Sequence, residues 1–165
     1  MFSSEFRDSR VELIPVDSVR DSGFLFDLFK KTHGWGLCQA PIPKEQLKQL
    51  IEIQLKAQSQ QYRSQFPHGE FCVIRECRGK PIGIFSCQIH EKVGTLIDIA
   101  ILPDAQGQGI GTRVVQSLLD HCRSVGVGRV EAHVVRDNPA LSLWKRLGFE
   151  IVAEEGLHFQ LSRCF

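Results

Sequence analysis

The chain has 165 residues, of which 42% are hydrophobic and 24% are charged, with 14 Gly and 7 Pro. A length close to the usual domain size of about 150 residues predicts one compact domain over residues 1–165. These proportions exclude a disordered, collagen-like or coiled-coil chain. Twenty Lys and Arg against 19 Asp and Glu give a formal net charge of +1, which disfavours a nucleic-acid-binding surface.

The first half of the chain predicts, in order, one strand, two helices and a hairpin of two strands. Both helices follow from apolar residues at helical spacing. Asp21 is expected to cap the first helix and Pro43 to open the second. The turn Arg78-Gly79-Lys80 joins the two strands of the hairpin. The expected elements are a strand over 11–16, a helix from 21 to the run 33–36, a helix over 43–66, and strands over 71–77 and 81–90.

The second half alternates strands and helices. Strands are expected over 96–102 and 129–135, with an amphipathic helix between them, and a last helix over 139–147 precedes a closing strand near 157–161. A strand, helix, strand sequence predicts a parallel pair. We therefore expect an α/β (α+β) fold, in which a mixed, mostly antiparallel sheet has one parallel pair and is flanked by about four helices.

The six cysteines form no CxxC pair and no Cys/His spacing typical of a zinc site. Residues 1–10 carry four charges and do not resemble a signal peptide. We therefore expect free, mostly buried thiols in a cytoplasmic protein, with no disulfide and no metal. No stretch of about 18 apolar residues is present, so we expect no membrane-spanning helix.

The segment Ile99 to Thr112, IAILPDAQGQGIGT, is the most informative of the chain. It reads as a buried strand that ends at Pro103, followed by three alternating glycines at the start of a helix. A helix N-terminus with glycines before it presents free N–H groups, which favours pyrophosphate binding over a plain turn. The dinucleotide motif would need Gly in place of Thr112, and the P-loop would need a Lys-Ser/Thr pair that is missing, so neither motif fits.

The glycine run Gln106-Gly107-Gln108-Gly109-Ile110-Gly111 resembles the Gln/Arg-x-x-Gly-x-Gly/Ala acetyl-CoA signature of the GNAT superfamily of N-acetyltransferases. Residues 138–149, NPALSLWKRLGF, are similar to the second signature of that family. The two signatures cover about residues 96–150. The resemblance implies a GNAT-type domain with an acceptor-side half over 1–92 and an acetyl-CoA-binding half over 93–165.

The same resemblance implies a set of coenzyme contacts. Backbone N–H groups of residues 106–112 would hold the pyrophosphate of acetyl-CoA, the one cosubstrate expected. The amide at Ile101 would polarise the thioester carbonyl, as an oxyanion hole does. The parallel pair would splay to admit the thioester, and Asn138 and the last helix would pack on the coenzyme. The expected coenzyme-binding residues are Ile99, Ala100, Ile101, Gln106, Gly107, Gln108, Gly109, Ile110, Gly111, Thr112, Asn138, Leu141 and Trp144.

Trp144 stands where the family usually has a Tyr that protonates the departing thiolate. An indole N–H donates a hydrogen bond but transfers no proton at neutral pH. A thiol whose pKa is about 8.5 leaves as a thiolate without a proton from a Tyr, so acetyl transfer does not depend on that residue.

A base must take the proton of an ammonium acceptor before its nitrogen attacks. His133 titrates in the useful range, and Glu131 on the same strand face is expected to orient it. Asp98 interrupts an apolar strand and would share a face with Leu96 unless a bulge shifts the phase. A solvated strand face and a structural Asp are the plainer interpretations, so the catalytic roles of these three residues are hypotheses.

The expected function is direct transfer of acetyl from acetyl-CoA to a primary amine of a small molecule, peptide or protein. GNAT-type proteins often dimerise, so a homodimer is among the expectations, whereas nucleic acid and membrane are not. A stripe formed by Gln54, Gln58, Gln61 and Gln65 lines an acceptor groove or is a solvated helix face. The alternative function, suggested by Trp144, is a catalytically weak or inactive acetyl-CoA-binding sensor or interaction module.

Overall fold

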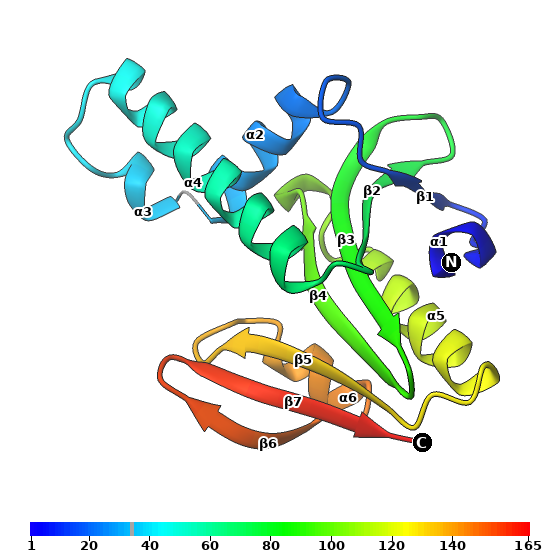
Figure 1. Ribbon diagram of the computed structural model, residues 1–165. Coiled ribbons are helices and arrows are strands. Elements are labelled where there is room, and N and C mark those ends of the chain that lie inside the picture. The colour runs from blue at the N-terminus through cyan, green and yellow to red at the C-terminus, as the bar shows by residue number, and fades with distance from the viewer. Residues whose placement is uncertain (34) are drawn as a thin grey trace.

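The computed structural model describes residues 1–33 and 35–165. Within them, the strands are β1 (Val11–Pro15), β2 (Glu70–Glu76), β3 (Pro81–His90), β4 (Val93–Ile101), β5 (Arg129–Val135), β6 (Glu150–Glu155) and β7 (His158–Cys164). They form one seven-stranded sheet in the order β1-β2-β3-β4-β5-β7-β6. Only β4 and β5 run parallel among these neighbours, and the mixed α/β fold expected from the sequence is therefore confirmed (Figure 1).

Helices cover both faces of the sheet. The described chain contains α1 (Phe2–Glu5), α2 (Ser22–Thr32), α3 (Trp35–Cys38), α4 (Lys44–Gln65), α5 (Ile110–Ser124) and α6 (Leu141–Arg146), with a short 3-10 helix η1 (Pro103–Ala105). In Figure 1, α5 lies behind β3 and β4, whereas α2 and α4 lie in front of them. The groove of the candidate site is lined by α2, α4 and the sheet.

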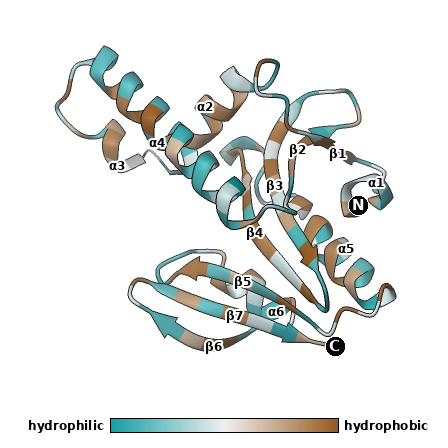
Figure 2. Ribbon diagram, viewed as in Figure 1, coloured by the Kyte–Doolittle hydropathy of each residue, from teal (hydrophilic) through white to brown (hydrophobic). Residues whose placement is uncertain are grey.

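The core lies between α5 and the sheet. The buried face of α5 has the three- and four-residue spacing expected of an amphipathic helix, and it packs on hydrophobic residues of β3 and β4 (Figure 2). Leu118 and Leu119 are almost completely buried there. Shortening either side chain to Ala would cost about 2–5 kcal/mol, because the lost burial leaves a cavity. This packing fixes the direction of α5 and therefore the position of its N-terminus.

The parallel pair separates along its length. Residues 93–96 of β4 pair with residues 129–132 of β5, and the ladder stops there. Figure 1 shows the two strands diverging beyond that point, so that β5, β7 and β6 form the second arm of a V. The later residues of β4 and β5 are therefore not paired with each other, and a gap separates the backbones of the two strands, as the resemblance implies for a splayed pair.

A β-bulge reorients the middle of β4. Leu96 pairs with Cys87, whereas Asp98 pairs with Ser86, so β4 has one residue more than β3 between these two rungs. Cross-strand partners share a face, and successive residues of β3 face opposite ways. Asp98 therefore lies on the face opposite to Leu96, which is buried in the core. The bulge shifts the phase, and Asp98 and Leu96 do not share a face.

Asp21 does not cap α2 with its side chain, contrary to the sequence prediction. Its carboxylate is 1% exposed and instead accepts hydrogen bonds from the Asp17 N–H, from Arg20 and from Arg75 of β2. The hydrogen bonds from Arg20, opposed by burial, lower the pKa of Asp21 to about 2, with help from Asp17 and Arg75. A long-range ion pair thus replaces the local cap and ties the start of α2 to the sheet.

Three elements were not expected from the sequence. Helix α1 is four residues long and is held by Glu70, which accepts hydrogen bonds from the N–H groups of Phe2 and Ser3. Helix α3 lies in the region 33–36 and after it, where the sequence was expected to end α2. Gly34 of this region lies outside the described residues. Strand β6 is the edge of the sheet and leaves Val152 exposed, so its sequence lacks a buried alternating pattern.

The six cysteines are free in the structure. Cys72, Cys87 and Cys122 are buried, whereas Cys77 and Cys164 are exposed, so the thiols are less buried overall than expected. Burial raises the pKa of Cys122 to about 11, which keeps that thiol neutral in the core.

Candidate functional site

The glycine-rich turn opens α5 with two residues in the left-handed region. Gly107 has φ of 74° and Gly109, the residue that precedes the first turn of α5, has φ of 73°. No side chain of the described chain caps this helix end. A Cβ added at Gly107 would meet nothing within 4 Å in the part of the chain that the structure describes. The turn is therefore open, and the free N–H groups of α5 are available to an anion.

The end of β4 presents backbone groups to the gap. The N–H of Leu102 donates to Ile82 O on β3, so the polar groups of Ile101, one residue earlier, point away from β3. The N–H and C=O of Ile99, two residues before Ile101, point in the same direction as those of Ile101, whereas Ala100 between them pairs with Ile84 on β3. The side chain of Gln106 donates to Ile101 O over 2.9 Å, which links the turn to this edge. The Ile101 N–H thus has the orientation that the expected contact with a thioester carbonyl would need.

Gly111 and Thr112, in the first turn of α5, have different surroundings. A Cβ on Gly111 would lie 3.4 Å from the Ile101 side chain, so the glycine lets α5 approach β4 closely. Thr112 is exposed, and Ile110 is buried in the core. Gln108 donates to Asp104 O within the same loop, over 3.4 Å. Of these residues, Gln108 and Thr112 are exposed.

Helix α6 carries a buried donor without a partner among the described residues. Asn138 Oδ1 accepts a hydrogen bond of 2.8 Å from the Ala140 N–H and so stabilises the turn that leads into the helix. Trp144 is 3% exposed, and its ring meets Phe149 edge-on at 5.6 Å. Its Nε1 is buried and has no hydrogen-bond partner among the described residues. A buried indole N–H usually has a partner, so this atom suits a ligand acceptor.

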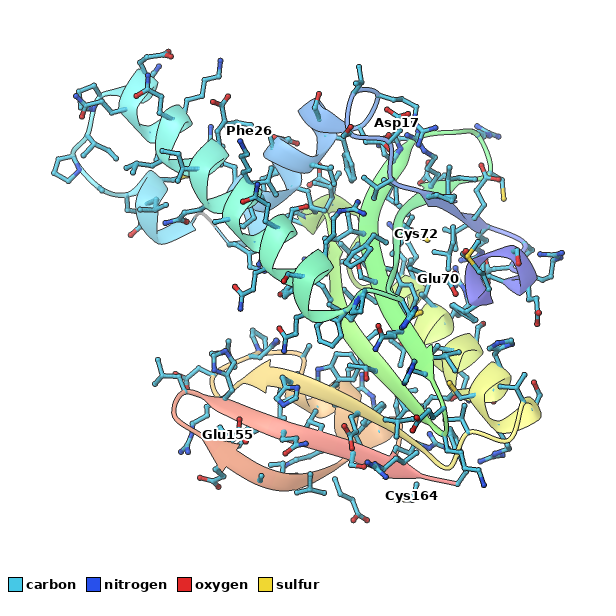
Figure 3. All side chains as sticks on the ribbon, in the orientation of Figure 1. Asp17, Phe26, Glu70, Cys72, Glu155 and Cys164 are labelled. Atoms are coloured by element: carbon cyan, nitrogen blue, oxygen red, sulfur yellow. The ribbon has the colours of Figure 1, made fainter. Side chains whose placement is uncertain are left out.

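A groove of about 930 Å³ lies on the face of the sheet opposite to α5. Helices α2 and α4 form its walls, and β2, β3 and β4 contribute to its floor. Phe26 on the α2 wall lies between α2 and α4 (Figure 3). Ser86 and Asp98, the cross-strand pair created by the bulge, are both on the floor.

Asp98 and Tyr62 are the titratable groups that this groove perturbs most clearly. Burial raises the pKa of Asp98, although the positive charge of His33 and the Ile99 N–H act in the opposite direction. Burial, together with the charge of Asp98, raises the pKa of Tyr62 to about 12. Ser86 beside them is 5% exposed. A carboxyl group with a raised pKa is better matched to taking a proton near neutral pH than an ordinary Asp.

His133 and Glu131 lie outside this groove. Glu131 is bound to Arg129 by an ion pair of 2.6 Å, and no hydrogen bond joins it to His133 in the described residues. His133 is exposed and lies opposite Gln160 of β7. Of the three acid–base candidates, the structure thus brings only Asp98 to the floor of the groove.

Sequence reasoning did not single out Tyr62 or Ser86 as site residues. Tyr62 lies at one of the apolar positions with helical spacing that predict α4, and it is the single Tyr of the chain. Of the four glutamines predicted either to line an acceptor groove or to form a solvated helix face, only Gln58 lines the groove. The groove face of α4 bears Lys48, Lys56 and other charged residues instead.

Within the described residues, no group of three His, Cys, Asp or Glu side chains is placed to hold a metal ion. No described helix is long and apolar enough to cross a membrane.

Several proteins of known sequence match parts of the chain. A mycothiol acetyltransferase from Corynebacterium jeikeium is 40% identical over 63 residues, which are 38% of this chain and 18% of that protein. An uncharacterized N-acetyltransferase from Methanocaldococcus jannaschii is 32% identical over 85 residues, which are 47% of this chain and 38% of that protein. The chain therefore spans much less than half the length of these relatives.

Solved structures match the whole fold. The PaiA N-acetyltransferase from Thermoplasma acidophilum in complex with coenzyme A has a TM-score of 0.69 over 94% of this chain and 99% of that chain, with 15% identity. A GNAT-family acetyltransferase from Bordetella pertussis has a TM-score of 0.65 over 96% and 98%, with 24% identity. Residues 38–149 match the model of the acetyltransferase (GNAT) family. This match includes the glycine-rich turn, β4, β5 and α6, and the chain belongs to the GNAT family of acetyltransferases.

Proposed function

We propose that this chain is an acetyl-CoA-dependent N-acetyltransferase that transfers acetyl directly to a primary amine within a ternary complex. The observation that carries the proposal is the open glycine-rich turn at the start of α5, next to the gap between β4 and β5. The family match supports the acetyl donor, and the solved neighbour from Thermoplasma acidophilum holds coenzyme A. We treat residues 1–165 as one catalytic domain in this proposal.

The chain would hold acetyl-CoA through its backbone. The N–H groups that follow Gly107 and Gly109 bind the pyrophosphate, because a helix N-terminus attracts anions. The N–H of Ile101 points into the gap and polarises the thioester carbonyl. The indole Nε1 of Trp144 is the buried donor left over for a coenzyme acceptor. These contacts position the acetyl group at the edge of β4.

Asp98 is the base that we favour, because it lies on the groove floor and its pKa is raised. Asp98 accepts the proton of the acceptor ammonium, and the freed nitrogen lone pair forms the new C–N bond. The C–S bond breaks, and its electron pair leaves with sulfur as a thiolate. The second proton that the nitrogen loses on becoming an amide passes through water to this thiolate, so that coenzyme A leaves as a thiol. Trp144 hydrogen-bonds this leaving group without transferring a proton. Positioning of the two substrates supplies much of the rate enhancement.

The experiment that tests this function combines calorimetric titration with acetyl-CoA, coenzyme A, NAD and ATP and a thiol-release assay over a panel of amines. We expect selective binding of acetyl-CoA and amine-dependent release of thiol. Absence of coenzyme A binding would overturn the proposal. Binding without release over small amines, peptides and proteins would favour the second candidate, a coenzyme-binding module, which the replacement of the usual Tyr by Trp144 supports.

A further inference from the structure

The groove that contains Asp98 is long. Its α4 wall follows one helix face through Lys48, Glu52, Lys56, Ser59 and Arg63, at intervals of three or four residues. A helix rises 1.5 Å per residue, so this wall is about 22 Å long. An extended peptide advances about 3.3–3.6 Å per residue, and the wall therefore matches about six residues. A single amino acid or a small amine would occupy only one end.

The reactive end of the groove is the C-terminal end of α4. Tyr62, in the last turns of this helix, lines the groove together with Asp98, and burial and the charge of Asp98 raise the pKa of Tyr62 to about 12. Arg63 follows Tyr62 in the chain, and its guanidinium carbon lies 4.8 Å from the centroid of the Phe71 ring. The wall then leads away from Asp98 in one direction, toward Lys48. This arrangement suits the amine at the end of a chain better than a lysine inside one.

The floor beside Asp98 is apolar. Ile84 lies two residues before Ser86 on the same face of β3, and Phe71 contributes from β2. Phe26 and Leu25 add apolar surface from α2. An acceptor that places its amine at Asp98 therefore buries its first side chain against apolar groups, which favours an apolar first residue.

The α4 wall of the groove carries an excess of positive charge, from Arg63 at the reactive end to Lys48 at the far end. Lys48, Lys56 and Arg63 line it against the single carboxylate of Glu52. None of these four side chains forms an ion pair with another residue of the described chain. Unpaired cations along a groove attract and orient a partner of opposite charge. Acidic side chains following the apolar first residue would complement them.

We infer that the acceptor is the N-terminal amine of a peptide or protein segment that begins with an apolar residue and continues with acidic residues along α4. This inference rests on the proposed acetyl transfer and names its substrate class. The amine lies at Asp98, the first side chain lies on the floor formed by Phe71 and Ile84, and the acidic residues lie opposite Lys56 and Arg63. Each of these groups lines the groove, and neither Lys56 nor Arg63 forms an ion pair within the described chain.

The experiment measures kcat/KM of the full chain with saturating acetyl-CoA. Its substrates are seven-residue peptides with an N-terminal Leu and either Glu or Lys at positions three to six, the Lys peptide with a blocked N-terminus, and small amines. We expect the Glu peptide to exceed the free Lys peptide by about tenfold or more. The difference should shrink with added salt, because salt screens exposed charges.

Charge reversal identifies the surface responsible. The double variant Lys56→Glu/Arg63→Glu should lose the preference for the Glu peptide and gain activity on the free Lys peptide. The matched control Arg78→Glu/Lys80→Glu reverses two exposed charges in the turn between β2 and β3, and it should leave the preference unchanged.

Three outcomes would overturn the inference alone: equal kcat/KM for the two free peptides, activity on the blocked Lys peptide as high as on the Glu peptide, or small amines that match the Glu peptide. Unchanged preference in the Lys56→Glu/Arg63→Glu variant would also overturn it. Thiol release from none of the acceptors would instead contradict the proposed transferase function itself, and the inference would fall with it.

Discussion

Replacement of Gly109 by Val tests whether the glycine-rich turn binds the coenzyme. Gly109 has φ of 73°, a conformation in which an L side chain costs about 1–2 kcal/mol. A Cβ there would meet only Nη1 of Arg113, at 3.9 Å, so no clash adds to this cost. For a chain of this size, the loss corresponds to a fall in Tm of about 2–8 °C.

The effect on coenzyme binding should be larger than this loss of stability implies. A Val side chain, or a backbone that rotates to relieve its strain, disturbs the N–H groups at the start of α5. Each hydrogen bond to a charged group contributes about 1.5–3 kcal/mol, so the loss of one lowers affinity by about tenfold or more. Calorimetric titration with coenzyme A at a temperature well below Tm measures this loss directly.

Gly126 provides the matched control, because it has φ of 76° and lies just beyond the opposite end of α5. A Cβ at Gly126 would meet nothing within 4 Å among the described residues. Gly126→Val should therefore lose about the same stability as Gly109→Val and keep its affinity for coenzyme A. If Gly109→Val is destabilised but binds coenzyme A as tightly as the unmodified chain, the turn is not the pyrophosphate site.

Three further variants test the base, the buried indole and the ion pair of α2. Asp98→Asn should lower kcat by about 100-fold or more without weakening coenzyme A binding and should remove the acidic limb of the pH–rate profile; if His133→Ala does this instead, the base is misassigned. Trp144→Phe, which removes the unpartnered N–H, should lower kcat or coenzyme affinity by about fivefold or more, and a variant equal to wild type in both would remove Trp144 from the mechanism. Asp21→Asn should lower the free energy of unfolding by about 2 kcal/mol at pH 7. Because the folded pKa of about 2 lies below 3.8, the contribution of Asp21 is present above pH 3.8 and is lost as pH falls through 2. Urea unfolding should therefore show the difference between the two proteins shrinking below pH 4, and a difference that is constant down to pH 2 would refute the role of the ion pair.

The coenzyme half of the fold followed from the sequence because its signals are local. Gly107 and Gly109 are needed for left-handed backbone, and the apolar period of α5 matches its buried face. The observed bounds of β5, residues 129–135, equal those expected from its alternating pattern. Turn chemistry and periodicity depend on residues that are neighbours in the chain, so they can be recognised without knowledge of the fold.

The acceptor half depended on contacts between distant residues. The groove joins Tyr62 of α4, Ser86 of β3 and Asp98 of β4, and the sequence of each element alone reads as an ordinary helix or strand. The bulge that aims Asp98 at the groove is a property of its pairing with β3, and no residue type marks it. Likewise, Asp21 looks like a helix cap until Arg75, 54 residues away, is seen to bind it.

The sequence by itself therefore determined the fold family and the glycine-rich turn, since both are written in short motifs and regular spacing. Only the tertiary structure decided which carboxylate lies on the groove floor, what surrounds it and which cations line the α4 wall. The reason is physical: the pKa of Asp98 and the charge along the α4 wall arise from the burial and proximity of side chains that folding alone brings together.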